Sequence, residues 1–157
     1  MQKKITTFLT FDGQAEEAMN LYTSVLPNSR IVSTRRYGEA GPGEEGSLMT
    51  GTFELDGQEF MALNGGPSFA FSQGISLFVD CETQEEVDRL WEKLSEGGEP
   101  GPCGWLTDRF GVSWQIIPRA LGELLDDQDP EKANRVMKAM LGMGKIEVDG
   151  LRKAYEG

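Results

Sequence analysis

Histidine and cysteine, two residue types that often act in catalysis and metal binding, are absent or scarce in this chain. Its 157 residues contain no histidine, which excludes Ser-His-Asp and Cys-His nucleophile systems and any metal site that needs imidazole. Two cysteines are present, Cys81 in an apolar segment and Cys103 between proline and glycine. Their spacing suggests neither a metal site nor a disulfide. We expect Cys103 to be a packed thiol, since no histidine is available as its base.

The charge and hydropathy of the chain limit the kinds of partner that it can bind. The chain has 26 acidic against 15 basic residues and a formal charge of −11, which argues against nucleic acid and anionic membranes as partners. No apolar window approaches the ~18 residues of a membrane span. The segment Met1–Ile5 is basic but lacks the apolar stretch of a signal peptide. These features predict a soluble cytoplasmic protein with neither nucleic-acid nor membrane partners.

The elements that must position any site occur twice. An alternating strand, Ile5–Phe11, leads into a helix that begins at Ala15-Glu16-Glu17, and Ile75–Cys81 leads into a second helix that begins at Gln84-Glu85-Glu86. A self-match at a fixed period indicates a duplicated architectural unit. The seam between two like halves is a common place for a ligand.

The first unit reads as βαβββ. The pattern predicts a helix over 14–25, a strand over Arg30–Tyr37, and a hairpin of Leu48–Leu55 and Glu59–Leu63 around Asp56-Gly57. Asp-Gly is a strong signal for a two-residue hairpin turn. We expect the loop Gly38–Gly46, which holds four glycines and a proline, to be exposed and mobile.

The second unit repeats this order more compactly. Thr83 and Glu86 are spaced as a capping box for a helix that runs to about Leu94. Pro100–Trp105 is predicted to be a tight crossing and Val112–Ile117 a buried strand. The predicted fold class is α+β: one domain over 1–157 with two paired βαβββ units (5–66 and 75–118) and a C-terminal helical extension (119–157).

The extension has no counterpart in the first unit. Asp129-Pro130 is typical of an N-cap followed by proline at the first helical position. An apolar stripe follows at Ala133, Val136, Met137, Met140 and Leu141. Methionine-rich stripes usually belong to a core or an interface, so we expect the extension to lie over a sheet or a partner subunit.

Paired βαβββ units resemble the vicinal oxygen chelate superfamily, which includes glyoxalase I, extradiol dioxygenases and bleomycin-resistance proteins. Within it the chain is similar to the PhnB-like branch, which often carries the label 3-demethylubiquinone-9 3-methyltransferase. The matching segments span almost the whole chain: Phe11–Ala18, Leu63–Pro67, Gln84–Asp88, Gly97-Gly98, Cys103–Trp105 and Trp114–Ile116. The resemblance implies a cupped mixed sheet whose first and last strands supply the site.

The resemblance also implies where metal ligands would stand. Because strand side chains alternate, Ser76, Phe78 and Asp80 should face the cup if Leu77, Val79 and Cys81 face the helix. The repeat offset and the last strands then place the four ligand positions at Thr6, Met61, Ser76 and Gln115. Two hydroxyls, a thioether and one amide are a poor cage for a divalent ion, so we predict a metal-free site and no cofactor.

The remaining cup residues are polar and mostly uncharged. Thr50 and Thr52 share the cup face with the carboxylates of Glu54 and Asp80. A desolvated carboxylate there could be a general base, although both residues also fit solvated strand ends. We predict ligand binding by Thr6, Thr50, Met61, Ser76 and Gln115. The alternative is a threonine-rich sheet face that binds nothing.

Three functions remain open at this point. The first is binding of a small molecule, for example sequestration of a toxic or aromatic compound, in a metal-free cup. The second is a cofactor-free lyase or isomerase that uses Glu54 or Asp80. The third is methyl transfer, as the family label suggests, but no glycine-rich nucleoside loop follows a predicted strand. An open cup exposes apolar surface that a two-fold partner would cover, so we predict a homodimer.

Overall fold

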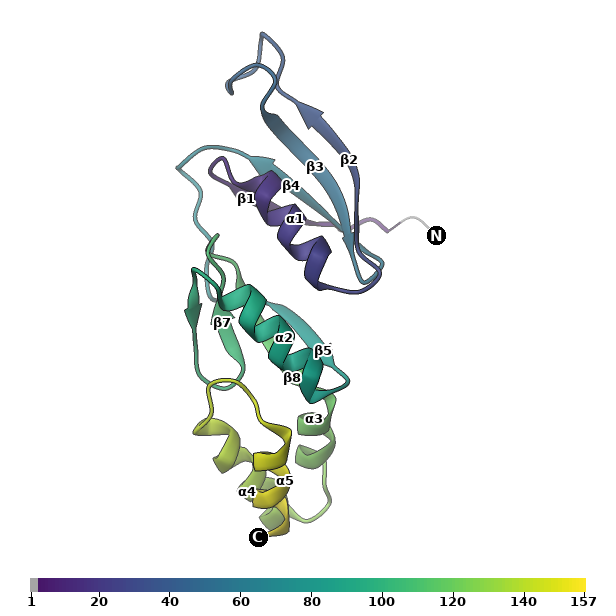
Figure 1. The fold of residues 1–157 in the computed structure, drawn as a ribbon, viewed down its shortest axis with the longest axis vertical. Helices are drawn as coiled ribbons and strands as arrows, with labels where there is room; N and C mark the ends of the chain where they lie inside the picture. Colours follow the sequence, from purple (N-terminus) through teal and green to yellow (C-terminus); the bar gives the residue numbers. More distant parts are fainter. Residues whose placement is uncertain (1–2) are drawn as a thin grey trace. The chain divides into compact units, whose positions relative to one another are not determined.

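The computed structural model describes residues 3–157. The chain divides into two compact units, Met1–Ala70 and Phe71–Gly157, which Figure 1 colours from purple to teal and from teal to yellow. No helix in residues 3–157 is long and apolar enough to cross a lipid bilayer.

The described part of the first unit is a four-stranded mixed sheet with one helix against it (Figure 1). The strand order is β1-β4-β3-β2, with β1 parallel to β4 and the other neighbours antiparallel. The elements are β1 (Thr7–Phe11), α1 (Ala15–Val25), β2 (Arg30–Arg36), β3 (Leu48–Leu55) and β4 (Gln58–Asn64).

Helix α1 packs on the first sheet through a single apolar face. Met19 and Tyr22 are fully buried, and the Tyr22 ring lies 6.5 Å from that of Phe53, which in turn stacks on Phe60 at 5.4 Å. Gly51 allows this approach, because a Cβ there would lie 2.5 Å from the Met19 side chain. Aromatic pairs at these centroid distances are favourable beyond the area they bury.

The second unit repeats the strand order as β5-β8-β7-β6, again with the first and last strands parallel. Its elements are β5 (Leu77–Cys81), α2 (Gln84–Ser95), β6 (Glu99–Pro100), β7 (Trp105–Thr107) and β8 (Ser113–Pro118). Two mixed sheets with the same order confirm the predicted pair of βαβββ units and the α+β class.

A buried carboxylate organises the turn between β7 and β8. Asp108 is 2 % exposed and accepts hydrogen bonds from the backbone N–H groups of Phe110 and Val112 and from the indole N–H of Trp114, all at 2.9–3.0 Å. Gly98 lets β6 approach this turn, because a Cβ would meet the Thr107 carbonyl oxygen at 2.2 Å. A buried ionised group is tolerated because several donors satisfy it.

The C-terminal extension comprises α3 (Arg119–Leu125), α4 (Pro130–Leu141) and α5 (Val148–Glu156). These helices bury Leu121, Val136, Ile146 and Leu151 together with Ile117 of β8. The extension therefore builds a core on the end of the second sheet, as Figure 1 shows below α2 and β8.

Polar bonds tie the extension to the second unit. The Gln84 side chain donates to the Ile146 carbonyl at 2.9 Å and accepts from the Val148 N–H at 2.7 Å. Lys145 lies 2.7 Å from Asp88 on α2. The backbone N–H of Cys103 donates to the Met143 carbonyl at 2.7 Å. The tail, which was expected to lie over a sheet or a partner subunit, thus packs against the end of β8 and against α2 of its own unit.

Three details differ from the sequence-based expectations. Strands β1 and β5 begin two residues late, since Ile5 and Ile75 are 90 % and 76 % exposed. The predicted tight crossing is a short antiparallel hairpin of β6 and β7. In the α4 stripe, Val136 is buried, whereas Met137 and Leu141 are exposed.

Candidate functional site

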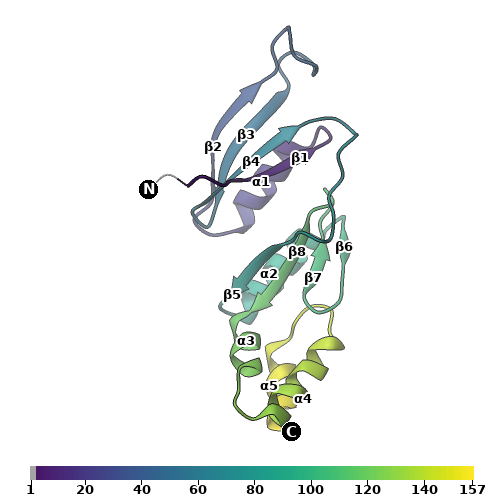
Figure 2. The same cartoon turned by 180° about the vertical axis from the view of Figure 1, so that it is seen from behind.

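Each sheet has one face that its helix does not cover, as Figure 2 shows for the second unit, where β5 and β8 lie in front of α2. In the first unit, Leu9 and Phe11 of β1 are buried on the α1 side, and Phe8 between them is 48 % exposed. In the second unit, Cys81 is buried and Phe78 is 59 % exposed. The predicted alternation of strand faces is therefore present in both units.

On the first open face, Met61 lies between two neighbouring strands. It is paired with Phe8 of β1 on one side and with Thr52 of β3 on the other. Thr50 lies two residues before Thr52 in β3 and is paired with Leu63. Thr6 precedes β1, and its hydroxyl donates to the Glu59 carboxylate at 3.4 Å.

On the second open face, Gln115 occupies the matching place. It is paired with Phe78 of β5 and Trp105 of β7, so an amide stands between two aromatic residues. Its Nε2 donates to the Ser76 hydroxyl at 3.0 Å. The structure thus brings Ser76 and Gln115 together, at positions equivalent to Thr6 and Met61 of the first unit.

Both candidate general bases already have arginine partners. Glu54 lies 2.8 Å from Arg30, and Asp80 lies 2.9 Å from Arg119. The hydrogen bonds that the Arg119 guanidinium donates to the Asp80 carboxylate raise the pKa of this guanidinium above its ordinary value. Sequence reasoning missed both arginines as partners, because their contacts depend on tertiary structure.

The residues at the expected metal positions do not fit a divalent ion. The first unit offers a hydroxyl from Thr6 and a thioether from Met61, and the second offers a hydroxyl and an amide that are bonded to each other. Over residues 3–157, no three carboxylates or thiolates lie close enough together to hold a metal ion. Divalent transition metals prefer imidazole, thiolate or carboxylate donors.

Two surface grooves are lined by residues other than the five predicted ligand-binding residues. One, of about 550 Å³ in the first unit, contains the Arg36–Glu16 ion pair at 2.9 Å and the ring of Tyr37. The other, of about 560 Å³, runs beside β6 and β7 in the second unit and contains Trp105 and Ser113. Sequence reasoning did not single out either residue as part of a site.

Two mixed sheets of identical strand order, each with one open face, match the glyoxalase/bleomycin-resistance-like fold. A family model described as 3-demethylubiquinone-9 3-methyltransferase matches residues 3–117. The chain belongs to this PhnB-like family. The match ends just before α3, so the C-terminal extension lies outside it.

Solved structures agree with this assignment. A putative 3-demethylubiquinone-9 3-methyltransferase, the PhnB protein of Bacillus cereus, is 47 % identical with a TM-score of 0.68, over 74 % of this chain and 99 % of its own. A Pseudomonas aeruginosa protein shares the fold at 23 % identity and a TM-score of 0.62, over 74 % and 98 %. A fosfomycin resistance protein of Listeria monocytogenes shares it at 12 % and 0.50, over 75 % and 93 %. A comparison with curated proteins found no match.

Proposed function

We propose that this protein binds a small organic molecule on its open sheet faces without a metal ion, through Thr6, Thr50 and Met61 in the first unit and Ser76 and Gln115 in the second. One observation carries the proposal: the amide of Gln115 stands between Phe78 and Trp105 on a face that no helix of its unit covers. An amide flanked by aromatic rings provides directional hydrogen bonds inside apolar contact area, as ligand sites usually do.

Binding is favoured over catalysis by the state of the carboxylates. Glu54 and Asp80 are each engaged by an arginine at 2.8–2.9 Å, so neither is a free base beside a ligand. The methyltransferase in the family description receives no support from the strand ends, since neither β1 nor β5 leads into a glycine-rich nucleoside loop.

The proposal includes a homodimer. Phe8 and Phe78, at equivalent positions in the two units, leave 48 % and 59 % of their surface exposed. Exposed aromatic side chains on a sheet face favour association with a second surface. Light scattering at micromolar concentration should give twice the chain mass of 17.3 kDa. A strictly monomeric mass would contradict this part of the proposal.

Capture of small molecules tests the binding itself. Immobilised protein is equilibrated with a metabolite extract, and the retained compounds are identified by mass spectrometry. We expect the wild type to retain compounds that Gln115→Leu releases. Gln58→Leu, which removes an exposed amide from the start of β4, is the matched control and should retain them. Equal retention by all three proteins would reject the second face as a binding surface.

A further inference from the structure

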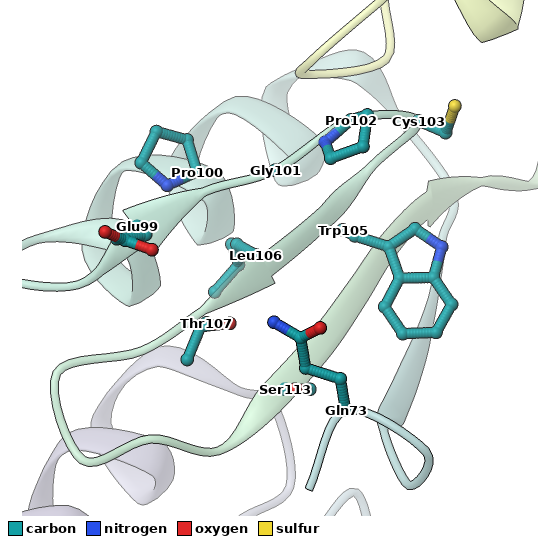
Figure 3. A pocket seen from close by; sticks show the side chains of 10 residues that line it. All are labelled: Gln73, Glu99, Pro100, Gly101, Pro102, Cys103, Trp105, Leu106, Thr107 and Ser113. Atoms are coloured by element: carbon teal, nitrogen blue, oxygen red, sulfur yellow. The ribbon is translucent and has the colours of Figure 1, made fainter.

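The groove of the second unit is lined by an aromatic ring, by polar uncharged side chains and, at its edge, by one carboxylate. Figure 3 shows the amide of Gln73 between the Trp105 indole and Thr107, with Ser113 below the amide and the chain of Glu99–Pro102 along the opposite edge. Trp105 is half-buried, so part of its ring remains available. The groove has a volume of about 560 Å³ and is open to solvent, which is within the range of small-molecule sites.

Ser113 is the unusual member of this lining. It is 2 % exposed, and its hydroxyl is the single buried side-chain oxygen or nitrogen in the described part of the chain that lacks a hydrogen-bond partner. Ser113 is paired with Thr107 and precedes Trp114, which is buried on the helix side. Its hydroxyl therefore points to the open face, where the groove lies.

An unpartnered buried hydroxyl carries a free-energy cost, because it gives up its hydrogen bonds to water and gains none in the folded protein. The hydroxyl does not stabilise the fold, since an alanine side chain would fill nearly the same space without a buried polar atom. A bound molecule that offers a hydrogen-bonding atom would satisfy the hydroxyl. The geometry thus points to a ligand whose polar atom reaches the floor of the groove.

The lining also defines what that ligand is. Of the ten lining residues, Glu99 alone carries a charge, and it is exposed at the rim. Trp105 offers an aromatic face, and aromatic rings stack on such faces in offset or edge-to-face arrangements. A negative group would be repelled by Glu99 and would find no cationic partner in the lining.

We propose that this groove binds an uncharged planar ring that carries a carbonyl or amide group, with the ring against Trp105 and the polar atom bonded to the Ser113 hydroxyl. Gln73 and Thr107 provide further donors and acceptors along the same edge. The inference rests on the proposed function, because Trp105 is paired with Gln115 on the same sheet face, and it adds the class of ligand.

Three probes of the same shape test the ligand class. Benzamide, benzoate and benzamidine differ in charge but not in ring size, and their binding is followed by NMR through the indole N–H signal of Trp105. We expect benzamide to shift this signal with an affinity at least about fivefold higher than benzoate, because the carboxylate of benzoate is repelled by Glu99, an effect of about 1 kcal/mol for two charges at close range in water. If either charged probe binds as tightly as benzamide, the assignment of an uncharged ligand is wrong.

Substitution of Ser113 tests the role of the hydroxyl. Ser113→Ala should keep or raise the melting temperature, because it removes an unsatisfied buried group, and should weaken benzamide binding by about five- to tenfold. Ser24→Ala is the control, because the exposed Ser24 hydroxyl only donates to the Leu21 carbonyl within helix α1, and it should not affect benzamide binding. A lower melting temperature with unchanged benzamide affinity would assign Ser113 a structural role and overturn the inference.

Two further comparisons separate this inference from the proposed function. Trp105→Leu should abolish the preference for benzamide even if Ser113→Ala folds poorly. Because this variant lacks the indole N–H, its binding is followed through the NMR signals of the probe itself, and benzamide binding that survives the substitution would overturn the groove assignment. If Ser113→Ala leaves benzamide binding unchanged while Gln115→Leu releases the captured compounds, the groove assignment fails and the proposed function stands. If Ser113→Ala weakens benzamide binding while Gln115→Leu retains every compound, the five predicted residues fail and the groove remains.

Discussion

The two βαβββ units share a strand order but stabilise their helices and turns differently. In the first unit, α1 has no side-chain cap of its own, and the Asn64 side chain at the end of β4 accepts from the Ala15 N–H at 2.9 Å. In the second unit, α2 is capped locally by Thr83, which accepts from the Glu86 N–H at 3.1 Å. The N-termini of these two equivalent helices are thus capped by a residue distant in sequence in the first unit and by an adjacent residue in the second.

The turns between the last two strands differ as well. The first unit uses the exposed hairpin at Asp56-Gly57, where Asp56 has a φ of +49°. The second uses Asp108, buried and bonded to three N–H donors. The comparison teaches that the second unit holds its polar groups under tighter constraint. Variants of the two turns and of the two helix caps test that difference, and two further predictions test burial and ion pairing within the second unit.

The largest expected contrast is between the two cysteines. Burial raises the pKa of the Cys81 thiol from 9.0 to about 12, and the nearby Glu86 carboxylate adds to the shift. Because the thiolate is the nucleophile, this shift lowers its fraction near pH 8 by about a thousandfold. We therefore expect iodoacetamide to modify Cys103, which is partly exposed, long before Cys81.

The pH dependence of Cys81 has a defined sign. The folded protein keeps this thiol neutral up to about pH 12, while the unfolded chain ionises it near 9.0. The stabilising contribution is thus complete below pH 9 and is lost as the pH rises toward 12. Peptide mapping after alkylation checks the reactivity, and Cys81 labelled as fast as Cys103 in the folded protein would contradict the burial of its thiol.

Asp108→Asn should be the most damaging isosteric change in the turns. It removes the charge from a carboxylate that three donors satisfy, at a cost of about 2–3 kcal/mol in the free energy of unfolding. Asp56→Asn is the matched control, because asparagine tolerates a positive φ, and it should cost less than about 0.5 kcal/mol. Urea unfolding measures both, and equal losses would remove the proposed difference between the turns.

The helix caps predict a smaller contrast. Asn64→Ala removes the cap on α1 and also the bond from the Asn64 Nδ2 to the Leu48 carbonyl at 3.2 Å, so about 1.5–2 kcal/mol should be lost. Thr83→Ala removes a single local bond and should cost about 1 kcal/mol. Circular dichroism during urea unfolding reports both variants. A larger loss in Thr83→Ala would reverse the comparison.

The smallest expected effect concerns the docking of the extension on α2. Hydrogen bonds from Lys145 and Gln84 lower the pKa of Asp88 below its ordinary value of 3.8. The stability that the ionised Asp88 contributes is complete above pH 3.8 and is lost as the pH falls through the lowered pKa. Asp88 and Lys145 are 46 % and 30 % exposed, so Asp88→Asn should cost about 0.5 kcal/mol or less at pH 7. Its stability difference from the wild type should vanish in acid, and a constant difference would exclude the ion pair as its cause.

Much of this fold was predictable from local pattern. The alternation of side chains in β1 and β5 placed Phe8 and Phe78 each on the open face of its own sheet. The strand registers confirm that Met61 and Gln115 are equivalent positions. The capping box was half right: Thr83 caps α2, but the Glu86 carboxylate accepts from the N–H of Glu82 at 2.9 Å. Patterns that extend over several residues survive folding because burial on one face enforces them.

The features that could not be predicted from the sequence are those that depend on tertiary contacts. Strands β6 and β7 are two and three residues long, too short to show a period, so their hairpin was missed. A serine in a strand carries no sign that its hydroxyl will be buried without a partner, as at Ser113. The arginine partners of Glu54 and Asp80 come from other elements of the same unit, which no spacing along the chain reveals.

The most direct test of the central claim is a pair of measurements on Gln115→Leu. Its partner Ser76 is only partly buried and can bond to water in the variant. The binding account therefore predicts an unchanged or higher melting temperature, together with an affinity for a captured compound that is weaker by about tenfold, or 1.4 kcal/mol. A lower melting temperature with unchanged affinity in calorimetry would show that Gln115 serves the fold alone, and would contradict binding on the second open face.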